Sequence, residues 1–345
     1  MGTNPATSIA DIAETMATTS EEVVRSLVGD PTIDQPVRCR LTEAAHDMGY
    51  APLAAPRDRL ERPLRLALVL KTFRGDDPDA NRFYAPITSA ISIACSKAGA
   101  RVEHVLAGVD ARYRLLDIPP TIDLAGCDGA FVIGCQLDAI AVEQVIRRGC
   151  PVILVDGYAD RDRFHSVVTD NLAGARAMVE TLARAGHRDI ALLGTEPNSY
   201  PSVLERRRGY AQAVRNLGFA EHYIDMSYVL THACAVIGMD YVRRHPELTA
   251  VFGANDLVTA EFMQLARDSG MRIPGDLSLA GFDDIDLASL VMPSLTTVGI
   301  DKSHMARAAF TLMAYALEQP DAAPVATRIG PNVVERESVG APRPR

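Results

Sequence analysis

From residue 64 onward, short apolar runs alternate with longer amphipathic stretches, and this alternation restricts the fold more than any other feature of the chain. The runs have the length of buried strands, and the stretches between them have helical periodicity. Strands that are buried on both faces and separated by helices are typical of parallel sheets. The expected strands are 66–70, 102–106, 129–133, 152–155, 190–193, 227–230, 250–252 and 277–281.

A different pattern precedes this body. Residues 8–50 contain three short helical patterns, which we expect to begin after Ser8, after Thr18 or Thr19, and near residue 35. The inward-facing residues of the second helix are expected to be Val23, Val24 and Leu27. Three short helices of this kind predict a helix-turn-helix domain in residues 1–50, called the N-terminal module below.

Two segments lack such patterns. Residues 51–63 contain three prolines and alternating charges, which is typical of a linker or hinge. Pro56 is expected to oppose a helix there, because proline removes a backbone donor and clashes with the preceding turn. Residues 339–345 are rich in proline and arginine, and we expect them to form a disordered tail.

Charge and motifs exclude several classes of function. The formal net charge of -9 gives no general attraction to polyanions, so a nucleic-acid contact must rest on a local basic surface. No apolar stretch is long enough to span a bilayer and residues 1–10 do not resemble a secretory signal, so we expect a cytoplasmic protein without membrane contact. The six cysteines contain no CxxC pair, and GxSxG, HExxH and P-loop motifs are lacking. We therefore expect no enzyme, no cofactor and no metal site.

Several motifs in the second half of the body follow the order and spacing of a known family. They are Val168-Thr169-Asp170-Asn171, Gly186-His187-Arg188-Asp189-Ile190, Arg206 with Gly209-Tyr210, Ala254-Asn255-Asp256, Ile273-Pro274, Gly281-Phe282-Asp283-Asp284 and Pro293-Ser294-Leu295-Thr296-Thr297. Through these residues the chain resembles the LacI/GalR-type transcriptional regulators over nearly its whole length.

The resemblance implies an all-α helix-turn-helix domain joined to an α/β periplasmic-binding-protein-like body of two doubly wound parallel-sheet subdomains. It also implies a homodimer and a small ligand in the cleft between the subdomains. Residues 339–345 carry no leucine heptad, so a tetramer built by a C-terminal coiled coil is not expected. The body is expected at 64–338, with an N-subdomain of about 64–160 plus 293–323 and a C-subdomain of about 161–292 plus 324–338.

Candidate ligand contacts follow from the same comparison. Ligands of doubly wound sheets lie at the carboxyl ends of strands, and acidic or amide side chains there suit a ligand with several hydroxyls. The resemblance places an arginine in the cleft, where its planar guanidinium can grip adjacent oxygens, together with an aromatic pair after the first strand. The expected ligand contacts are Phe83, Tyr84, Asp156, Arg206, Asn255 and Asp283.

Structural roles compete with some of these assignments. Asn255 and Asp256 begin an expected helix and could cap it, and for Asp256 the capping role is favoured. Phe83 and Tyr84 could be core residues instead. The chain has no tryptophan and places Ala233 where the family often has an aromatic lid. The favoured effector is therefore a sugar, a polyol or a sugar acid, not a purine.

In the family pattern, residues 19–27 form the recognition helix, whose N-terminal side chains enter the major groove of DNA. Ser20 and Glu21 take the positions that choose the operator sequence, and Arg25 matches an arginine that reads guanine. Thr18 and Thr19 can donate to phosphates. The expected partner is a palindromic operator, because a dimer presents two such helices.

The N-terminal module departs from the family in its charge and in several residues. Residues 1–60 hold five arginines, no lysine and nine acidic residues, a balance that opposes binding to phosphates. Glu22, Val24 and Val28 replace polar residues, and Ala17 replaces the turn glycine. In the hinge, the leucine that enters the minor groove is displaced to Leu60.

These features predict a ligand-responsive transcriptional regulator, in the first place a repressor, that binds operator DNA as a dimer. A carbohydrate effector in the interlobe cleft would control its DNA affinity. The acidic N-terminal module leaves a second hypothesis open, in which the chain is a small-molecule-binding relative whose N-terminal module binds DNA weakly or not at all.

Overall fold

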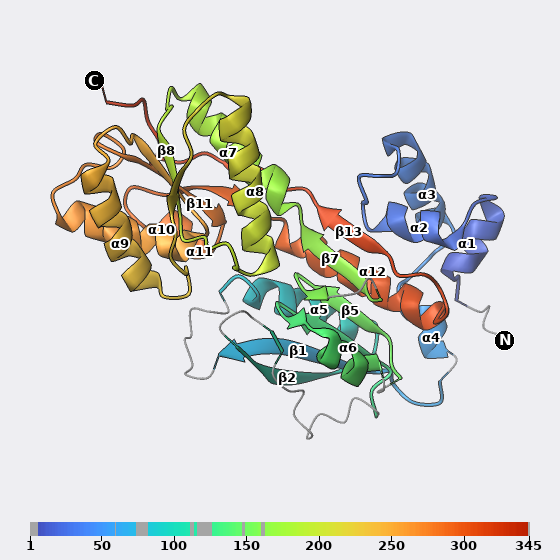
Figure 1. Cartoon of the computed structure of the whole chain (residues 1–345). Helices are drawn as coiled ribbons and strands as arrows, with labels where there is room; N and C mark the ends of the chain where they lie inside the picture. The colour runs from blue at the N-terminus through green and yellow to red at the C-terminus, as the bar shows by residue number, and fades with distance from the viewer. Residues whose placement is uncertain are drawn as a thin grey trace. The chain divides into compact units, whose positions relative to one another are not determined.

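A computed structural model describes residues 6–58, 60–73, 82–110, 114–115, 126–146, 149–159 and 163–343 (Figure 1). The chain forms two compact units. Unit 1 consists of residues 1–168 and 301–329, and unit 2 of residues 169–300 and 330–345. The chain therefore crosses from one unit to the other three times. Among the described residues, no helix is both long enough and apolar enough to cross a membrane.

The three expected helices of the N-terminal module are present in unit 1. They are α1 (Ile9–Thr15), α2 (Ser20–Leu27) and α3 (Gln35–Asp47). Ser8 caps α1 in a reciprocal box with Asp11, and the Thr19 side chain caps α2 by accepting from the Glu22 amide at 3.1 Å. Ala17, in the turn between these helices, has a φ of 51° and so adopts the left-handed angle that glycine normally provides.

A short helix follows in the linker, where Pro56 was expected to oppose one. Helix α4 (Ala54–Asp58) includes Pro56 at its third position. Proline is tolerated there because the first turn of a helix has no intrahelical partner for its N–H groups. Leu53 is fully buried just before this helix, whereas Leu60 is exposed. The linker is therefore partly anchored on unit 1.

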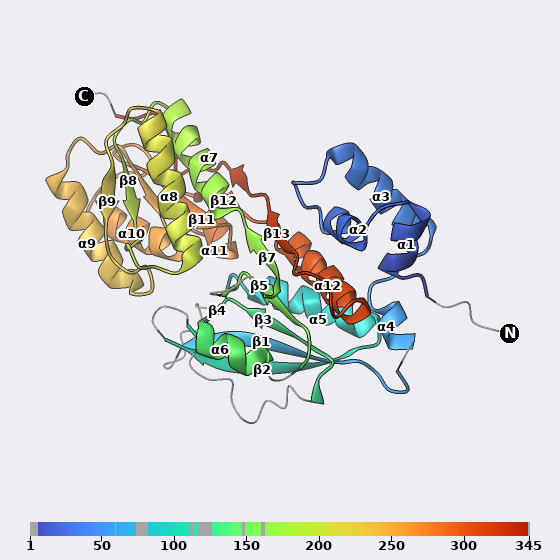
Figure 2. The same cartoon turned by 45° about the vertical axis from the view of Figure 1, so that its right-hand side comes forward.

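The body of unit 1 is a six-stranded sheet with the order β13-β7-β5-β3-β1-β2. Its strands are β1 (Arg65–Phe73), β2 (Arg101–Val109), β3 (Gly129–Ile133), β5 (Val152–Val155), β7 (His165–Thr169) and β13 (Ala326–Ile329). The pairs from β2 to β7 are parallel, as the buried apolar runs predict. Helices α5 (Ala85–Lys97), α6 (Ala139–Ile146) and α12 (Lys302–Glu318) accompany the sheet (Figure 2). The short strands β4 (Gln136–Leu137) and β6 (Tyr158–Ala159) pair with each other.

Unit 2 contains a second six-stranded sheet, with the order β14-β12-β11-β10-β8-β9. Its strands are β8 (Ile190–Leu193), β9 (His222–Ile224), β10 (Ala250–Gly253), β11 (Ser278–Asp283), β12 (Thr296–Gly299) and β14 (Asn332–Val334), and only β14 is antiparallel to its neighbour among the described pairs. The helices are α7 (Asn171–Arg184), α8 (Pro201–Asn216), α9 (Thr231–Arg244), α10 (Asp256–Asp268) and α11 (Asp286–Leu290).

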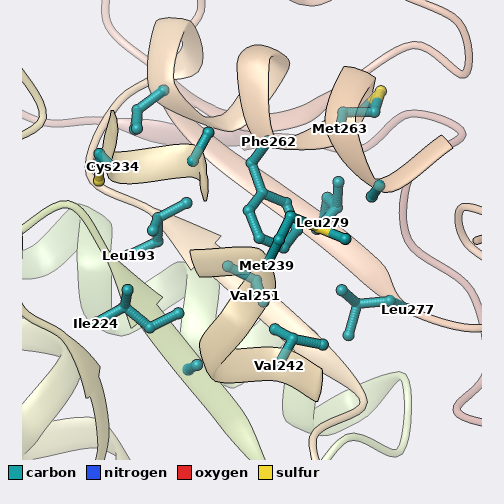
Figure 3. Packing of buried hydrophobic residues seen from close by; sticks show 14 of the residues in the cluster. Leu193, Ile224, Cys234, Met239, Val242, Val251, Phe262, Met263, Leu277 and Leu279 are labelled. Atoms are coloured by element: carbon teal, nitrogen blue, oxygen red, sulfur yellow. The ribbon is translucent and has the colours of Figure 1, made fainter. Parts of the chain in front are cut away.

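The helices of unit 2 cover the sheet in pairs, α7 with α8 and α9 with α10. Beneath α9 and α10, the Phe262 side chain lies among Met239, Val251 and Leu279, all of which are buried (Figure 3). Removing these apolar side chains from water is the main source of stability for the unit. This packing holds the strands of the sheet in place, and the strands in turn position the loops at their carboxyl ends.

Three expectations differ from the structure. Residues 227–230 form a turn and not a strand, because Leu230 is exposed and is the N-cap of α9. The strand in this part of the chain is β9, which ends at Ile224. Residues 326–329 form β13 in the sheet of unit 1, although 324–338 was assigned to the C-subdomain; hydrogen bonding of the Ser166 amide to the Val325 carbonyl at 2.9 Å holds this segment in place. The first two crossings also lie later, at residues 168–169 and 300–301.

The tail was expected to be disordered, but residues up to 343 pack on unit 2. The His187 ring lies 3.0 Å from the Gly340 carbonyl, and the Arg343 guanidinium donates to the Pro246 carbonyl at 2.7 Å. The expectation from composition was wrong. Proline has no backbone N–H, so an extended proline-rich segment can pack on the unit with few hydrogen bonds.

Candidate functional site

In unit 1, polar side chains gather where β1, β3 and β5 end. The Tyr84 hydroxyl donates to Asp156 Oδ2 at 2.7 Å, and both residues are buried. Asp156 follows β5 directly and has a φ of 47°, a left-handed angle that turns the chain sharply. Lys71 places its ammonium 4.7 Å from the centre of the Tyr84 ring. A Cβ on Gly134 would lie 2.7 Å from Tyr84 Cζ, so glycine is required beside the ring.

Phe83 packs on this group from the outside. Its ring meets Tyr84 edge to face at 5.0 Å between centroids, and the Lys302 ammonium lies 5.3 Å from the centre of the Phe83 ring. Tyr84 is 5% exposed, whereas Phe83 is only half-buried. The structure thus brings together the three ligand contacts predicted in unit 1, and Tyr84 also serves as a core residue.

In unit 2, Arg206 of α8 lies among acceptors at the ends of β10 and β11. Its guanidinium is 2.9 Å from Asp283 Oδ1, and it donates to Asn171 Oδ1 at 2.9 Å and to the Ala254 carbonyl at 2.6 Å. The guanidinium carbon is 3.8 Å from the centre of the Phe282 ring. The side chains of Arg206 and Asp283 are 7% and 13% exposed, so water screens their attraction poorly. These contacts hold the planar fork in one orientation.

The backbone at the end of β11 supports this geometry. Asp283 has a φ of 108° and Asp284 a φ of 47°, both in the left-handed range that residues with a Cβ rarely adopt. Such angles persist only where surrounding contacts enforce them. Arg336 provides one, since its guanidinium donates to Asp284 Oδ1 at 2.7 Å. Asp283 is therefore presented on a bent strand end.

Asp256 has a structural role, but it does not cap α10 as expected, because Asn255 occupies the N-cap position. It is fully buried, and its carboxyl group accepts from the Thr297 hydroxyl at 2.5 Å and from the Ile285 amide at 2.9 Å. Burial, with a further contribution from the Asp283 carboxylate, raises the pKa of Asp256 well above its usual value. This carboxyl group ties the loop after β11 to α10.

Asn255 stands at the N-cap of α10. Its side-chain oxygen accepts from the Val258 amide at 2.9 Å, and its backbone carbonyl accepts from the Thr259 hydroxyl at 2.6 Å. The capping role proposed for this residue is thus present, and it occupies the side-chain oxygen that a ligand contact would use.

Sequence reasoning missed two residues of these clusters. Lys71 is 5% exposed, and its signal was a lysine directly after the apolar run that ends at Leu70. Asn171 is fully buried and orients Arg206, but in the sequence it was only the last residue of the motif Val168-Thr169-Asp170-Asn171. Its partner on α8 could not be found from sequence, because the pairing depends on how the two helices pack.

Three side chains in unit 2 could hold a metal ion, although no metal site was expected. One ligand atom each from His222, His245 and Glu247 lies within 4.8 Å of the other two. The His245 ring nitrogen Nδ1 is already 2.9 Å from Glu247 Oε1, and Tyr241 stacks on the His245 ring at 4.2 Å. The cluster lies at the edge strand β9 and after α9, away from Arg206 and Asp283 in sequence and in sheet order.

The predicted DNA-contacting residues lie around the start of α2. Thr18 donates to the Glu22 carboxylate, and Thr19 caps the helix. Arg25 donates to Glu21 Oε1 at 2.8 Å and to Asp30 Oδ2 at 2.8 Å. These bonds occupy two donors of the guanidinium expected to read guanine. Glu21, in contrast, is exposed.

Known proteins are similar to this chain in part of the body and over nearly its whole length. Residues 179–339 match the periplasmic binding protein-like domain family. The HTH-type transcriptional repressor CytR of Escherichia coli is 27% identical over 317 residues, which cover 89% of each chain. The HTH-type transcriptional regulator CelR of Thermobifida fusca is 25% identical over 92% of this chain and 93% of its own.

A solved structure of the transcriptional regulator CelR in complex with cellobiose has a similar fold. It superposes with a TM-score of 0.67 at 22% identity, over 96% of this chain and 100% of that one. The fold, the N-terminal module and the matches along nearly the full length agree with the motifs found in the sequence. Over nearly its whole length, the chain is similar to transcriptional regulators of the LacI/GalR type.

Proposed function

We propose that this chain is a ligand-responsive repressor that binds a palindromic operator as a homodimer and takes a carbohydrate effector in its body. The proposal includes Phe83, Tyr84, Asp156, Arg206 and Asp283 as effector contacts, with Asn255 as a further contact through its amide nitrogen. Because it acts on DNA, the proposed location is the cytoplasm.

The observation that carries the proposal is the Arg206–Asp283 pair at the carboxyl edge of the unit 2 sheet. A guanidinium beside a carboxylate offers donors and acceptors in a fixed arrangement, which suits vicinal hydroxyls. Ligands of doubly wound sheets bind at this edge. Tyr84 and Asp156 provide a second donor–acceptor pair at the corresponding edge of unit 1.

Relatives support a sugar as the effector class. One solved relative is a CelR complex with cellobiose, and a LacI family regulator from Enterococcus faecium was solved with bound ribose. The lac repressor dimer, solved on its operator, supports the proposed dimer and DNA partner. All three share the fold of this chain at identities of 19% to 22%, so the particular sugar does not transfer.

A thermal-shift screen of ribose, cellobiose, other sugars, polyols and sugar acids tests the effector class. A ligand at about 100 times its Kd stabilises the folded state by about 2.7 kcal/mol, which a melting curve detects. The response should vanish in Arg206→Ala. It should persist in Arg208→Ala, which removes an exposed arginine two residues further along the same helix. If no carbohydrate shifts the melting temperature, or if Arg206→Ala responds like the unmodified chain, the proposed effector site is wrong.

The alternative, an N-terminal module that binds DNA weakly or not at all, also has an observation in its favour. Val24 and Val28 replace polar residues of the family's recognition helix, and both are fully buried. A gel-shift titration of the whole protein on its own promoter region at low salt separates the two. The absence of any retarded band, with and without effector, would favour the alternative.

A further inference from the structure

The outward side of α2 is covered by another part of the same unit. At about 100° per residue, positions 20, 21, 24, 25 and 28 lie within about 140° of the helix circumference, an arc that excludes Val23 and Leu27. Val24, which was expected to face inward with those two residues, lies in this arc instead. Val24 and Val28 lie in the middle of this arc, yet both are 0% exposed. Apolar side chains in that position therefore have a partner, and α2 contacts α12.

Hydrogen bonds join the two helices at both ends of the contact. The Gln319 amide donates to Ser20 Oγ at 2.8 Å, and the His304 ring donates through Nε2 to the Val28 carbonyl at 2.9 Å. Ser20 begins α2 and Val28 ends it, while His304 and Gln319 lie at opposite ends of α12. The two helices thus run antiparallel, and the contact extends along all of α2.

Close packing surrounds these bonds. A Cβ on Gly29 would lie 2.9 Å from the His304 ring, so the backbone after α2 approaches α12 as closely as glycine allows. Glu318 Oε2 accepts from the Ile9 amide at 2.8 Å, which binds the N-terminus of α1 to the end of α12. All residues of α12 from 305 to 316 except Arg307 are buried, and the helix also contacts α5, β3 and β5.

The charged side chains on this arc of α2, Glu21 and Arg25, form ion pairs within the N-terminal module. Arg25 is paired with Glu21 and with the buried carboxylate of Asp30, and its side chain is 24% exposed. Tyr315 of α12 is close enough to interact electrostatically with both Glu21 and Arg25. The side chains to which the family pattern assigns base reading, Ser20, Glu21 and Arg25, therefore contact α12 or pair with neighbours.

We propose that α12 is an intramolecular docking surface for the outward face of α2, and that the N-terminal module must leave α12 before it can read DNA. The inference rests on the proposed DNA-binding function of this module. A major groove about 12 Å wide admits one helix, and α12 occupies the side of α2 that the groove would take. DNA and α12 then compete for Ser20, Val24 and Val28, and docking lowers the apparent DNA affinity by the fraction of time the module is free.

The test uses full-length protein with changes on α12 only, so that the reading helix stays intact. His304→Glu places a carboxylate against the Val28 carbonyl, and Gln319→Ala removes the bond to Ser20 without a charge change. Ser303→Glu is the matched control, because it adds the same charge at the exposed neighbouring position. Carbene footprinting measures the labelling of residues 20–28, and gel shifts measure affinity for a duplex pool with a randomised centre.

We expect low labelling of residues 20–28 in the unmodified chain and in Ser303→Glu, and several-fold higher labelling in both release variants. If the N-terminal module is free less than a tenth of the time, release tightens binding to the duplex pool by about tenfold or more. High labelling of residues 20–28 in the unmodified chain would overturn the proposal. It would also be overturned if the unmodified chain binds the duplex pool and the release variants, despite higher labelling, bind it no more tightly. Increased labelling with no binding by any variant supports docking and overturns the proposed DNA function instead.

Discussion

Breaking the Arg206–Asp283 pair should destabilise unit 2 more than a surface mutation can. Arg206→Met keeps an apolar side chain against Phe282 but removes the donors to Asp283, Asn171 and the Ala254 carbonyl. Leaving one partner of a buried ion pair alone costs about 3–5 kcal/mol. With a total stability of about 5–15 kcal/mol for a typical domain, this loss is large enough to measure and small enough to leave folded protein.

The matched variants separate the ion pair from packing. Asp283→Asn alone should cost less than Arg206→Met, because an amide can still accept one bond and no unpaired carboxylate remains. The double variant Arg206→Met/Asp283→Asn should be more stable than the sum of the two losses predicts, since neither charge is left unpaired. Arg208→Met is the control for a change of charge on α8, and it should lie within about 0.5 kcal/mol of the unmodified chain.

Urea unfolding at pH 7 and 25 °C, followed by circular dichroism, gives the free energies of unfolding of the unmodified chain and of the four variants. The reasoning is refuted if Arg206→Met loses less than about 1 kcal/mol, which is the range of an exposed pair. Strict additivity in the double variant would also contradict it, because uncoupled side chains do not form a shared network.

Three further changes test other parts of the structure. The raised pKa of Asp256 means that the folded chain binds a proton the unfolded chain releases near pH 4, so stability falls as pH rises from there toward the folded pKa. Asp256→Asn should flatten this slope in urea titrations between pH 4 and pH 8, and an unchanged slope would show that Asp256 does not cause it. Ala17→Gly should raise the stability of the N-terminal module by about 1 kcal/mol, because glycine adopts a φ of 51° without strain; a lower melting temperature would count against this. Gly209→Ala should destabilise or prevent folding of unit 2, since its Cβ would lie 2.3 Å from the Leu172 carbonyl oxygen, and a variant that melts like the unmodified chain would show that α7 and α8 can separate there.

Local patterns predicted the fold well wherever burial is uniform. The fully buried strands β3, β5 and β8 begin and end at the predicted residues, because continuous apolar runs require the middle of a sheet. The helices of the N-terminal module were predictable from their caps, as with Ser8 and Thr19. The edge strand β9 escaped prediction. It has three residues, two of them half-buried, and a nearby half-buried segment that ends at the exposed Leu230 gave a stronger apolar signal.

For the site, the sequence located single residues but not their partners. Strand ends predicted Asp156 and Asp283, and the family motif predicted Arg206. The bond from Arg206 to Asn171 depends on the packing of α8 on α7, which local sequence does not encode. The contact of α2 with α12 likewise joins residues far apart in the chain. Val28 and His304 are separated by 276 positions, and only the folded structure places them together.

The central claim is that an effector in the body changes the affinity of the N-terminal module for DNA. It is tested most directly by fluorescence anisotropy of a labelled operator duplex, selected from the chain's own promoter region, with and without the sugar that gives the largest thermal shift. The account predicts that the sugar changes the Kd for the duplex by about 5-fold to 150-fold, and that Arg206→Ala abolishes the change. A sugar that binds the protein and leaves the Kd for DNA unaltered would contradict it.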